Sequence, residues 1–486
     1  MTSSLARRAR ELALTMTRWA SVTGSSGEVS FPSQLAEYLH FDRVWTQAIP
    51  QDNAGRSNLF ALKHGRSKRT IALTGHFDVV SVEDYGALQH LAFNPDALLE
   101  ASVARLRVTR ENPLALADFE CGNFLPGRGL LDMKAGLAAG LAAMEAYDGE
   151  MTLVFIGVSD EEEKSAGARA AVPQLKQLAA DENLDVALVI NLDAIADNGD
   201  GSTGRVVTYG SIGKQLLTAL VVGKQTHAGY PQNGVNAAYV LAELVREIEL
   251  APELAETTGN EVAAAPSTLF AKDLKQGYNV TTPHLAYGYW NTMQHRRNGA
   301  EVLDIALTLA ARAVARVEAK TGHTIALRCV ADLPPADHVV LDPALSLPDQ
   351  NLQALLALAN GIDEPTIMLG FGSIPYPAVL LRDDALRQAI SQAVKAHGLG
   401  EVNYFAGISD VSFFGEASGD LSIVAANTPI WGKGFVMPEA GGFPAINIGP
   451  WGRDYHTWLE RLHAPYAFEI LPRVLLSVIE AVAKLR

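Results

Sequence analysis

The stretch that decides the fold class is residues 151–192, MTLVFIGVSDEEEKSAGARAAVPQLKQLAADENLDVALVINL. Residues 151–158 and 185–192 are short apolar runs typical of buried strands, and residues 165–180 between them have the length of a helix. Two strands joined by a helical crossover pair in parallel, with the helix on one face of the sheet. The stretch therefore predicts an α/β fold with a mixed, largely parallel sheet flanked by helices.

The same alternation continues on both sides of this stretch. Residues 69–74 (RTIALT) have the pattern of a further buried strand, and residues 135–147 and 384–397 have helical patterns. The N-terminal residues 1–20 have the pattern of an amphipathic helix. The larger domain is therefore expected to be built from both ends of the chain.

A different style of sequence lies between these parts. Residues 197–205 are rich in Gly, Asp and Ser and mark a boundary. The elements expected beyond it are a strand over 214–222, a helix over 235–248, strands near Thr268 and Leu285, and a helix over 300–319. This order predicts a small inserted α+β domain. We expect the larger domain over 1–206 and 331–486, and the insert over 207–330.

Composition excludes several classes of function. The chain has 486 residues, enough for two or three domains, and a formal net charge of -15, which disfavours nucleic acid as a partner. Cys121 and Cys329 lack CxxC spacing, as expected of reduced thiols. The N-terminal stretch lacks the apolar core of a signal peptide, and no apolar run reaches the roughly 18 residues of a membrane span. We expect a cytoplasmic protein without a membrane partner.

Five polar clusters follow predicted strands. Ligands of open α/β sheets bind at the carboxyl ends of the strands, so these clusters are the candidate site. They are residues 74–78 (TGHFD), 127–136 (GRGLLDMKAG), 159–163 (SDEEE), 191–193 (NLD) and 454–461 (DYHTWLER).

Each cluster also has a purely structural explanation. His76 can ligate zinc while Asp78 accepts its other ring N–H, and a structural histidine is the alternative. Asp132 follows glycines and precedes a helix, so it can bridge two metals or simply cap the helix. In the acidic run after residue 158, one Glu can ligate a metal while its neighbour acts as general base; a solvated acidic face is the alternative.

Taken together the clusters are more specific than any one of them. Two imidazoles and three carboxylates suit two borderline-soft divalent ions, with one carboxylate shared and a position left for water. The candidate ligands are His76, Asp132, Glu162, Asp193 and His456.

In the order of all five clusters, the chain resembles the co-catalytic zinc exopeptidase family that includes aminoacylase, carboxypeptidase G, succinyl-diaminopimelate desuccinylase and bacterial dipeptidases. The segments SDEEEKSAG, AGISDVSFF and NIGPWGRDYHTWLERL look most like its arginine-utilisation (RocB-type) branch. The resemblance implies a zinc exopeptidase-like fold with a ferredoxin-like lid that dimerises.

The resemblance also implies roles for the clustered residues. His76 and His456 each bind one metal, Asp132 bridges both, and Asp193 completes the second metal's shell. Gly167 sets the register of the acidic run, which makes Glu161 the base and Glu162 a ligand. His463 competes with His456, but His456 has the matching HxxxER context. The Asp132–Met133 peptide bond is expected to be cis.

In the lid, THAGYP at residues 226–231 resembles the family's H-A-x-x-P segment, so His227 would donate to the developing oxyanion. Asn279 matches the lid's asparagine motif. Arg297, in preference to Arg296, matches an arginine for a substrate carboxylate, although His295 replaces the family's acidic residue and a solvated arginine pair stays open. Ser409 and Asp410 stand in place of the family's Thr-Asp pair and are expected to contact substrate. Residues 85–126 form a longer connection than the family usually has.

The implied function is metal-dependent hydrolysis of an amide bond in a small peptide or N-acyl amino acid, with two divalent ions. Zinc is the expected metal, although manganese and cobalt also suit the site. An N-acyl amino acid deacylase of the arginine or ornithine type shares the same site. A non-catalytic binding protein on this fold and an acidic protein without metal also stay open. A homodimer through the lid is the expected assembly.

Overall fold

Strands from the N-terminal and C-terminal parts of the sequence pair into one sheet. The computed structural model describes residues 4–335, 339–405, 407–417 and 419–485, and within them this sheet has eight strands. In spatial order they are β1 (Arg43–Ala48), β2 (Ser57–Lys63), β5 (Thr152–Val158), β3 (Arg69–His76), β6 (Asp185–Asn191), β19 (Ala445–Asn447), β8 (Val206–Thr208) and β18 (Gly400–Val402). β3 pairs in parallel with both β5 and β6, and β6 pairs in parallel with β19.

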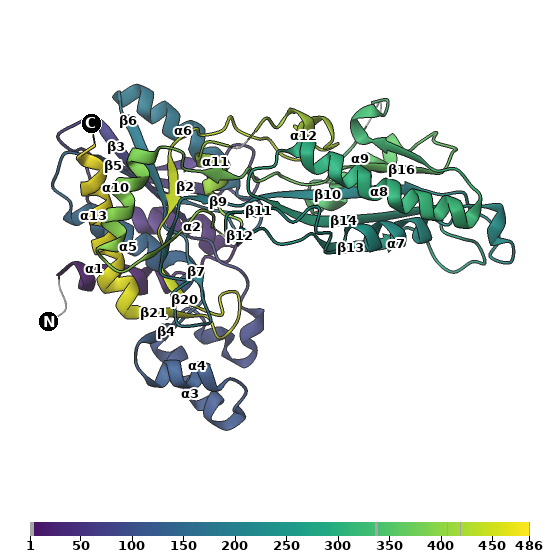
Figure 1. The fold of residues 1–486 in the computed structure, drawn as a ribbon. Helices are drawn as coiled ribbons and strands as arrows, with labels where there is room; N and C mark the ends of the chain where they lie inside the picture. Colours follow the sequence, from purple (N-terminus) through teal and green to yellow (C-terminus); the bar gives the residue numbers. More distant parts are fainter. Residues whose placement is uncertain (1–3, 336–338, 406, 418, 486) are drawn as a thin grey trace. The chain divides into compact units, whose positions relative to one another are not determined.

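Helices pack against this sheet. α1 (Ser4–Thr17), α5 (Ala135–Ala146) and α13 (Leu471–Ala483) contact one another, α10 (Asp384–Lys395) contacts α13, and α5 also contacts β3 and β5 (Figure 1). α6 (Ala166–Glu182) packs against β2 and β5, and α2 (Ser26–Ala36) packs against β1 and β2. The central strands β3 and β5 are buried along nearly their whole length because helices cover them. The expected mixed, largely parallel α/β sheet flanked by helices is confirmed.

A small second sheet in the same part of the molecule bears on the site. Its strands, in order, are β4 (Phe124–Pro126), β21 (Arg461–His463), β20 (Trp451–Arg453) and β7 (Ile195–Ala196). β20 and β21 are antiparallel, and the loop between them carries His456. Beside β4 lie α3 (Pro95–Thr109) and α4 (Pro113–Glu120), which follow the 3₁₀ segment η1 (Glu83–Leu91) (Figure 1).

The chain divides into two compact units. The first contains residues 1–211, 379–416 and 438–486, and the second contains residues 212–378 and 417–437. The second unit has a five-stranded sheet in the order β13 (Ser267–Asp273), β14 (Leu285–Gln294), β10 (Gly213–Val222), β16 (Thr366–Phe371) and β15 (Ala326–Cys329). α7 (Ala237–Ile248) and α8 (Gly299–Thr321) share an apolar core with the sheet, and α9 (Leu347–Leu358) joins a second cluster.

The elements of the insert match those expected from the sequence, but its end differs from the expected boundary at residue 330. β16 joins this sheet between β10 and β15, so the second unit continues to Ala378. A short apolar run such as 366–371 pairs with whichever strand edge the tertiary fold offers, and the local pattern does not identify that edge. Among the described residues, no helix combines the length and apolar character needed to cross a membrane.

Candidate metal centre

The predicted clusters meet at the carboxyl edge of the central sheet. His76 ends β3, the acidic run begins at Asp160, two residues after β5, and Asp193 follows β6 by two residues. Because β5, β3 and β6 are adjacent and parallel, their carboxyl ends lie at one edge. Asp132 lies in the turn Leu130–Lys134 before α5.

Five polar side chains form two groups with the spacing of metal ligands. The first group is His76, Asp132 and Asp193, and the second is Asp132, Glu162 and His456; in each, the ligand atoms lie within 4.8 Å of one another. Asp132 belongs to both. Its Oδ1 lies 3.1 Å from His76 Nε2, and its Oδ2 lies 3.1 Å from His456 Nε2. The five residues predicted as ligands are thus brought together, with Asp132 between the two imidazoles.

The electrostatics of this cluster fit bound cations. Burial lowers the pKa of His456, but hydrogen bonds to Asp132 and Glu162 outweigh this effect and raise its pKa to about 10. Burial likewise lowers the pKa of His76, and Glu161, Asp132 and Asp193 raise it well above its usual value. The surrounding carboxylates thus favour the protonated, positively charged form of both imidazoles. Two divalent ions would supply that charge and leave the imidazoles neutral, as metal ligation requires.

Glu161 and Glu162 point to different parts of the cluster. Glu162 Oε2 lies 3.2 Å from His456 Nε2, within the second group. Glu161 Oε2 lies 3.9 Å from His76 Nε2, and among the described residues Glu161 is in neither group. Glu162 thus lies within a ligand group and Glu161 beside one, and their roles as ligand and base stay predictions.

The carboxylate of Asp78 contacts the backbone of both glutamates, whereas the sequence predicts that it accepts the ring N–H of His76. His76 Nδ1 lies 2.9 Å from the backbone carbonyl oxygen of Asp78 and 3.7 Å from its carboxylate. The carboxylate instead accepts the backbone N–H groups of Glu161 at 3.1 Å and Glu162 at 3.3 Å. An extended HxD pattern places the two residues on one side but does not determine which oxygen of Asp78 meets the ring.

Further buried groups hold the acidic run and were not identified from the sequence. Asp160 has a φ of 64°, a left-handed conformation that residues with side chains rarely adopt. Its carboxylate is paired with Arg56, and its backbone N–H donates to Glu28 Oε1 at 2.9 Å. Burial, followed by the charge of Asp78, raises the pKa of Glu28 to about 7. Glu28 and Arg56 stand in no motif, so only their contacts reveal them.

Ser409 and Asp410 are buried in the same unit as the metal ligands. Ser409 Oγ accepts a hydrogen bond from Asn191 Nδ2 at 2.8 Å. Burial raises the pKa of Asp410 to about 7, although a hydrogen bond from Ser165 acts in the opposite direction. The contacts of Ser409 tie its loop to the end of β6, and substrate binding by this pair stays a prediction.

His463, the competing histidine, lies in an aromatic setting. Its ring centroid is 5.0 Å from that of Phe124 and 4.6 Å from that of Trp451, and its Nδ1 accepts the N–H of Tyr466 at 3.3 Å. Burial, with Arg205 and Arg453 nearby, lowers its pKa to about 4. Among the described residues it belongs to neither ligand group. The Asp132–Met133 peptide bond is cis, as predicted.

The predicted lid residues lie in the second unit. His227 is exposed, and its Nδ1 accepts the N–H of Gly229 at 3.0 Å. In the neutral ring this bond leaves the proton on Nε2. Asn279 Oδ1 accepts the N–H of Thr281 at 3.2 Å. Arg297 Nη1 donates to the carbonyl oxygen of Glu253 at 2.7 Å.

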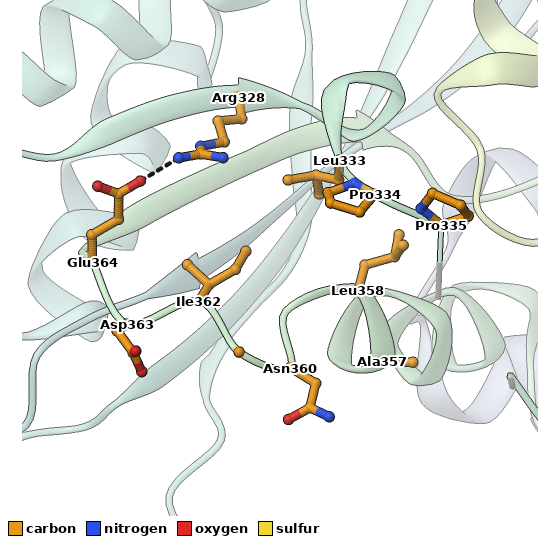
Figure 2. Close-up of a pocket in the computed structure, with 11 residues that line it drawn as sticks. Arg328, Leu333, Pro334, Pro335, Ala357, Leu358, Asn360, Ile362, Asp363 and Glu364 are labelled. Carbon is orange, nitrogen blue, oxygen red and sulfur yellow. Dashed lines mark hydrogen bonds and ion pairs between the residues drawn. The ribbon is translucent and has the colours of Figure 1, made fainter. Parts of the chain in front are cut away.

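The second unit also contains a pocket of about 700 Å³ (Figure 2). Its polar walls include an ion pair between Arg328 and Glu364, while Leu333, Pro334 and Leu358 supply apolar surface. The described residues that line it include no histidine or cysteine and neither ligand group. None of the predicted site residues is among the described residues that line this pocket.

Comparisons with known proteins agree with the geometry. The family model described as peptidase family M20/M25/M40 matches residues 72–429. The chain is 32% identical to the protein YqjN of Bacillus subtilis (strain 168), covering 97% of this chain and 96% of that protein. It is 26% identical to protein RocB of the same organism, covering 96% and 93%. The crystal structure of a tripeptidase from Staphylococcus aureus has a TM-score of 0.61 at 16% identity and covers 100% of both chains.

The similarity to RocB extends over nearly the whole chain, so the RocB-type branch expected from the sequence is confirmed. The two ligand groups at the carboxyl edge of the sheet give this family assignment a site capable of metal-dependent chemistry. The chain therefore belongs to peptidase family M20/M25/M40, and it is a metal-dependent hydrolase that acts on C–N bonds.

Proposed function

We propose that this enzyme hydrolyses the amide bond of a small peptide or an N-acyl amino acid with the aid of two divalent metal ions. The observation that carries the proposal is the position of Asp132, whose two carboxylate oxygens each lie 3.1 Å from a different imidazole. A carboxylate placed between two ligand groups suits a shared ligand of two ions. We propose His76 and Asp193 as the other ligands on one side, and Glu162 and His456 on the other.

In this proposal Glu161 is the general base. Bound ions at this site would polarise the scissile carbonyl and lower the pKa of water. Glu161 takes a proton from the attacking water and passes it to the leaving nitrogen. Its carboxylate is beside the first ligand group, 3.9 Å from His76 Nε2, yet outside both groups among the described residues. This position supports the choice of Glu161 as the base in the proposal.

Side chains outside the ligand groups have positioning or binding roles in the proposal. Asp78 holds the backbone of the acidic run through its two accepted N–H bonds. His227, with its proton on Nε2, is the proposed donor to the oxyanion, supplied by the second unit of a partner subunit in a homodimer. We propose Asn279, Arg297, Ser409 and Asp410 as substrate-binding residues, and zinc as the metal.

A deacylase of N-acyl arginine or ornithine is the second candidate. The observation that favours a deacylase is the similarity to succinyl-diaminopimelate desuccinylase 2 of Shewanella loihica, which is 32% identical over 40% of this chain. A deacylase and a dipeptidase can use the same ligands and the same base, because both break an amide bond next to an amino-acid carboxylate. A non-catalytic binding protein would not require a base beside the ligand groups.

The test is a hydrolysis screen on protein that has been stripped with a chelator and reconstituted with zinc, manganese or cobalt. Dipeptides are compared with N-acyl amino acids, including acyl-arginine and acyl-ornithine. We expect turnover only after reconstitution, with two ions bound per chain. Glu161→Gln is the control, since it keeps every proposed ligand. Full activity in stripped protein would exclude the metal mechanism, and two bound ions without turnover of either class would show that the substrate belongs to neither class.

A further inference from the structure

The loop that carries His456 has a conformation that its own sequence does not favour. It joins β20 to β21, and within it Asp454 and His456 have φ values of 52° and 62°. Residues with side chains rarely occupy this left-handed region, and they do so where the surroundings impose it. The position of the His456 imidazole therefore depends on contacts made by the rest of the loop.

Two arginines stand at the base of this loop. Arg453 ends β20, Arg461 begins β21, and the two are direct partners in the antiparallel register. Both are buried, with exposed fractions of 8% and 1%. Like charges directly opposite one another destabilise a strand pair, and burial strengthens their repulsion. The base of the loop therefore requires a counter-charge.

Asp118 of α4 supplies that counter-charge. Its carboxylate accepts two hydrogen bonds from Arg453 Nη1, at 2.7 and 2.6 Å, and one from Arg461 Nε at 2.8 Å. Arg461 in turn donates from Nη1 to Asp454 Oδ2 at 2.6 Å. The carboxylate of Asp118 thus links the two strands at the base of the loop. Through Arg461 it also restrains Asp454, two positions before His456.

The middle of the loop is held by the same segment of chain. Trp458 packs against the apolar cluster of Tyr85, Ala92 and Leu98, and the guanidinium carbon of Arg105 lies 3.9 Å from the centre of its ring. All four of these partners lie within residues 83–120, which we call the bracing segment; it comprises η1, α3 and α4.

The far end of the loop is connected to the bracing segment through Arg128. Arg128 Nη1 donates to Glu460 Oε2 at 2.7 Å, and its Nη2 donates to both carboxylate oxygens of Asp84, at 2.9 and 3.0 Å. Glu460 also accepts the N–H of Gly129 at 3.0 Å, three residues before Asp132. The contacts from the bracing segment therefore reach the loop at its base, middle and end.

We propose that Asp118 is a positioning residue for His456, and that the bracing segment sets the affinity of the metal position formed by Asp132, Glu162 and His456. The inference rests on the proposed function, since it requires that His456 binds a metal ion. In this proposal the bracing segment affects only one of the two metal positions. Asp118 contacts neither ligand group directly and acts through Arg453 and Arg461.

The experiment uses cobalt(II), whose absorption spectrum reports the ligand geometry. Stripped wild-type protein, Asp118→Asn and Glu120→Gln are titrated with cobalt in competition with a chelator. Asn keeps the shape of Asp118 and removes its charge. Glu120 lies on the same helix in an exposed pair with Arg107, so Glu120→Gln is the matched control. In Asp118→Asn we expect one of the two cobalt ions to bind about tenfold more weakly, with a changed spectrum, and the other to bind as in wild type. Glu120→Gln should match wild type.

A second pair of variants covers the case in which Asp118→Asn fails to fold, as judged by circular dichroism of the stripped protein. Arg105→Gln removes the contact with Trp458 from a partly exposed position, while Glu111→Gln removes only the carboxylate that Arg105 also contacts. Arg105→Gln should weaken the same single cobalt position by a few-fold, and Glu111→Gln should not.

The outcomes separate the two proposals. A wild-type protein that binds fewer than two cobalt ions would overturn the proposed function itself. A wild-type protein that binds two, with both affinities and the spectrum unchanged in Asp118→Asn, or with both affinities reduced equally, would overturn the positioning role alone. If Arg105→Gln is the variant tested, unchanged affinities and spectrum, or an equal reduction of both affinities, would likewise overturn the positioning role.

Discussion

The carboxylate of Asp78 accepts the backbone N–H of Glu161 at 3.1 Å. The bond fixes the backbone at the start of the acidic run, where consecutive side chains must serve different purposes. From this fixed point Glu162 reaches His456, while Glu161 lies beside His76. The register of the run is therefore a property of the backbone and can be tested one residue at a time.

The single substitutions Glu161→Gln and Glu162→Gln should differ in their effects: the first should reduce turnover, and the second should reduce metal binding. Glu161→Gln should abolish measurable kcat while the protein still binds two ions, because the amide keeps the shape but accepts no proton. Glu162→Gln should weaken one ion by tenfold or more, because a carboxylate ligand is lost. Metal analysis and steady-state kinetics on both variants provide the measurement. The reverse pattern would show that the register is displaced by one residue.

Asp78→Asn should reduce kcat more than it reduces metal affinity. His76 contacts the backbone carbonyl of Asp78, which the substitution keeps, whereas the two N–H bonds to the acidic run need both carboxylate oxygens. An amide presents one acceptor oxygen there and turns its NH₂ group toward the other N–H. We expect kcat to fall about tenfold to a hundredfold with two ions still bound. Loss of an ion with little change in the kcat of fully loaded protein would show that the carboxylate mainly serves His76.

His227→Ala should lower kcat by about 10²–10³-fold without changing metal content, as removal of an oxyanion donor does. If the histidine acts across a dimer, mixing His227→Ala with Glu161→Gln should restore part of the activity, because one of the two sites in a mixed dimer has both residues. Activity is measured after subunit exchange has been shown with tagged chains. Exchange without recovery would place His227 in the same subunit as its site, and full activity of His227→Ala alone would remove it from the reaction.

His463 should make the folded protein less stable in mild acid. Its pKa is lowered to about 4 in the folded chain, against about 6.5 when unfolded. Between these pH values the unfolded chain binds a proton that the folded chain does not. The contribution of His463 to the free energy of unfolding is therefore fully present above pH 6.5 and is lost as the pH falls toward 4. After allowance for partial exposure, the loss is about 2 kcal/mol.

The measurement is urea unfolding of chelated protein at pH 7 and pH 4.5, for wild type and His463→Asn. Asn keeps an acceptor for the N–H of Tyr466 and does not titrate in this range. The free energy of unfolding should fall less with pH in the variant than in wild type. Parallel changes in the two proteins would mean that the His463 imidazole takes up a proton in the folded state as readily as in the unfolded one.

Several features of this protein are determined by local sequence alone. The runs 69–74, 151–158 and 185–192 are apolar over the length of a strand, and they form β3, β5 and β6. Parallel strands place their carboxyl ends at one edge, so the residues that follow them, including His76, Glu161 and Asp193, had to lie close together. The α/β class and the location of the site follow from these local patterns.

The tertiary structure decided what depends on distant partners. Asp118 meets Arg453 and Arg461 across 335 and 343 residues of chain, and nothing in its helix distinguishes it from a surface acid. The run 366–371 fits a strand of either unit equally well until β10 and β15 offer it an edge. His463 and His456 stand seven positions apart with the same chemistry, and only the aromatic rings around one and the carboxylates around the other separate them. Periodicity reports which face of an element is buried, but a buried charge or an unpaired strand edge is satisfied by whichever partner the whole fold brings to it.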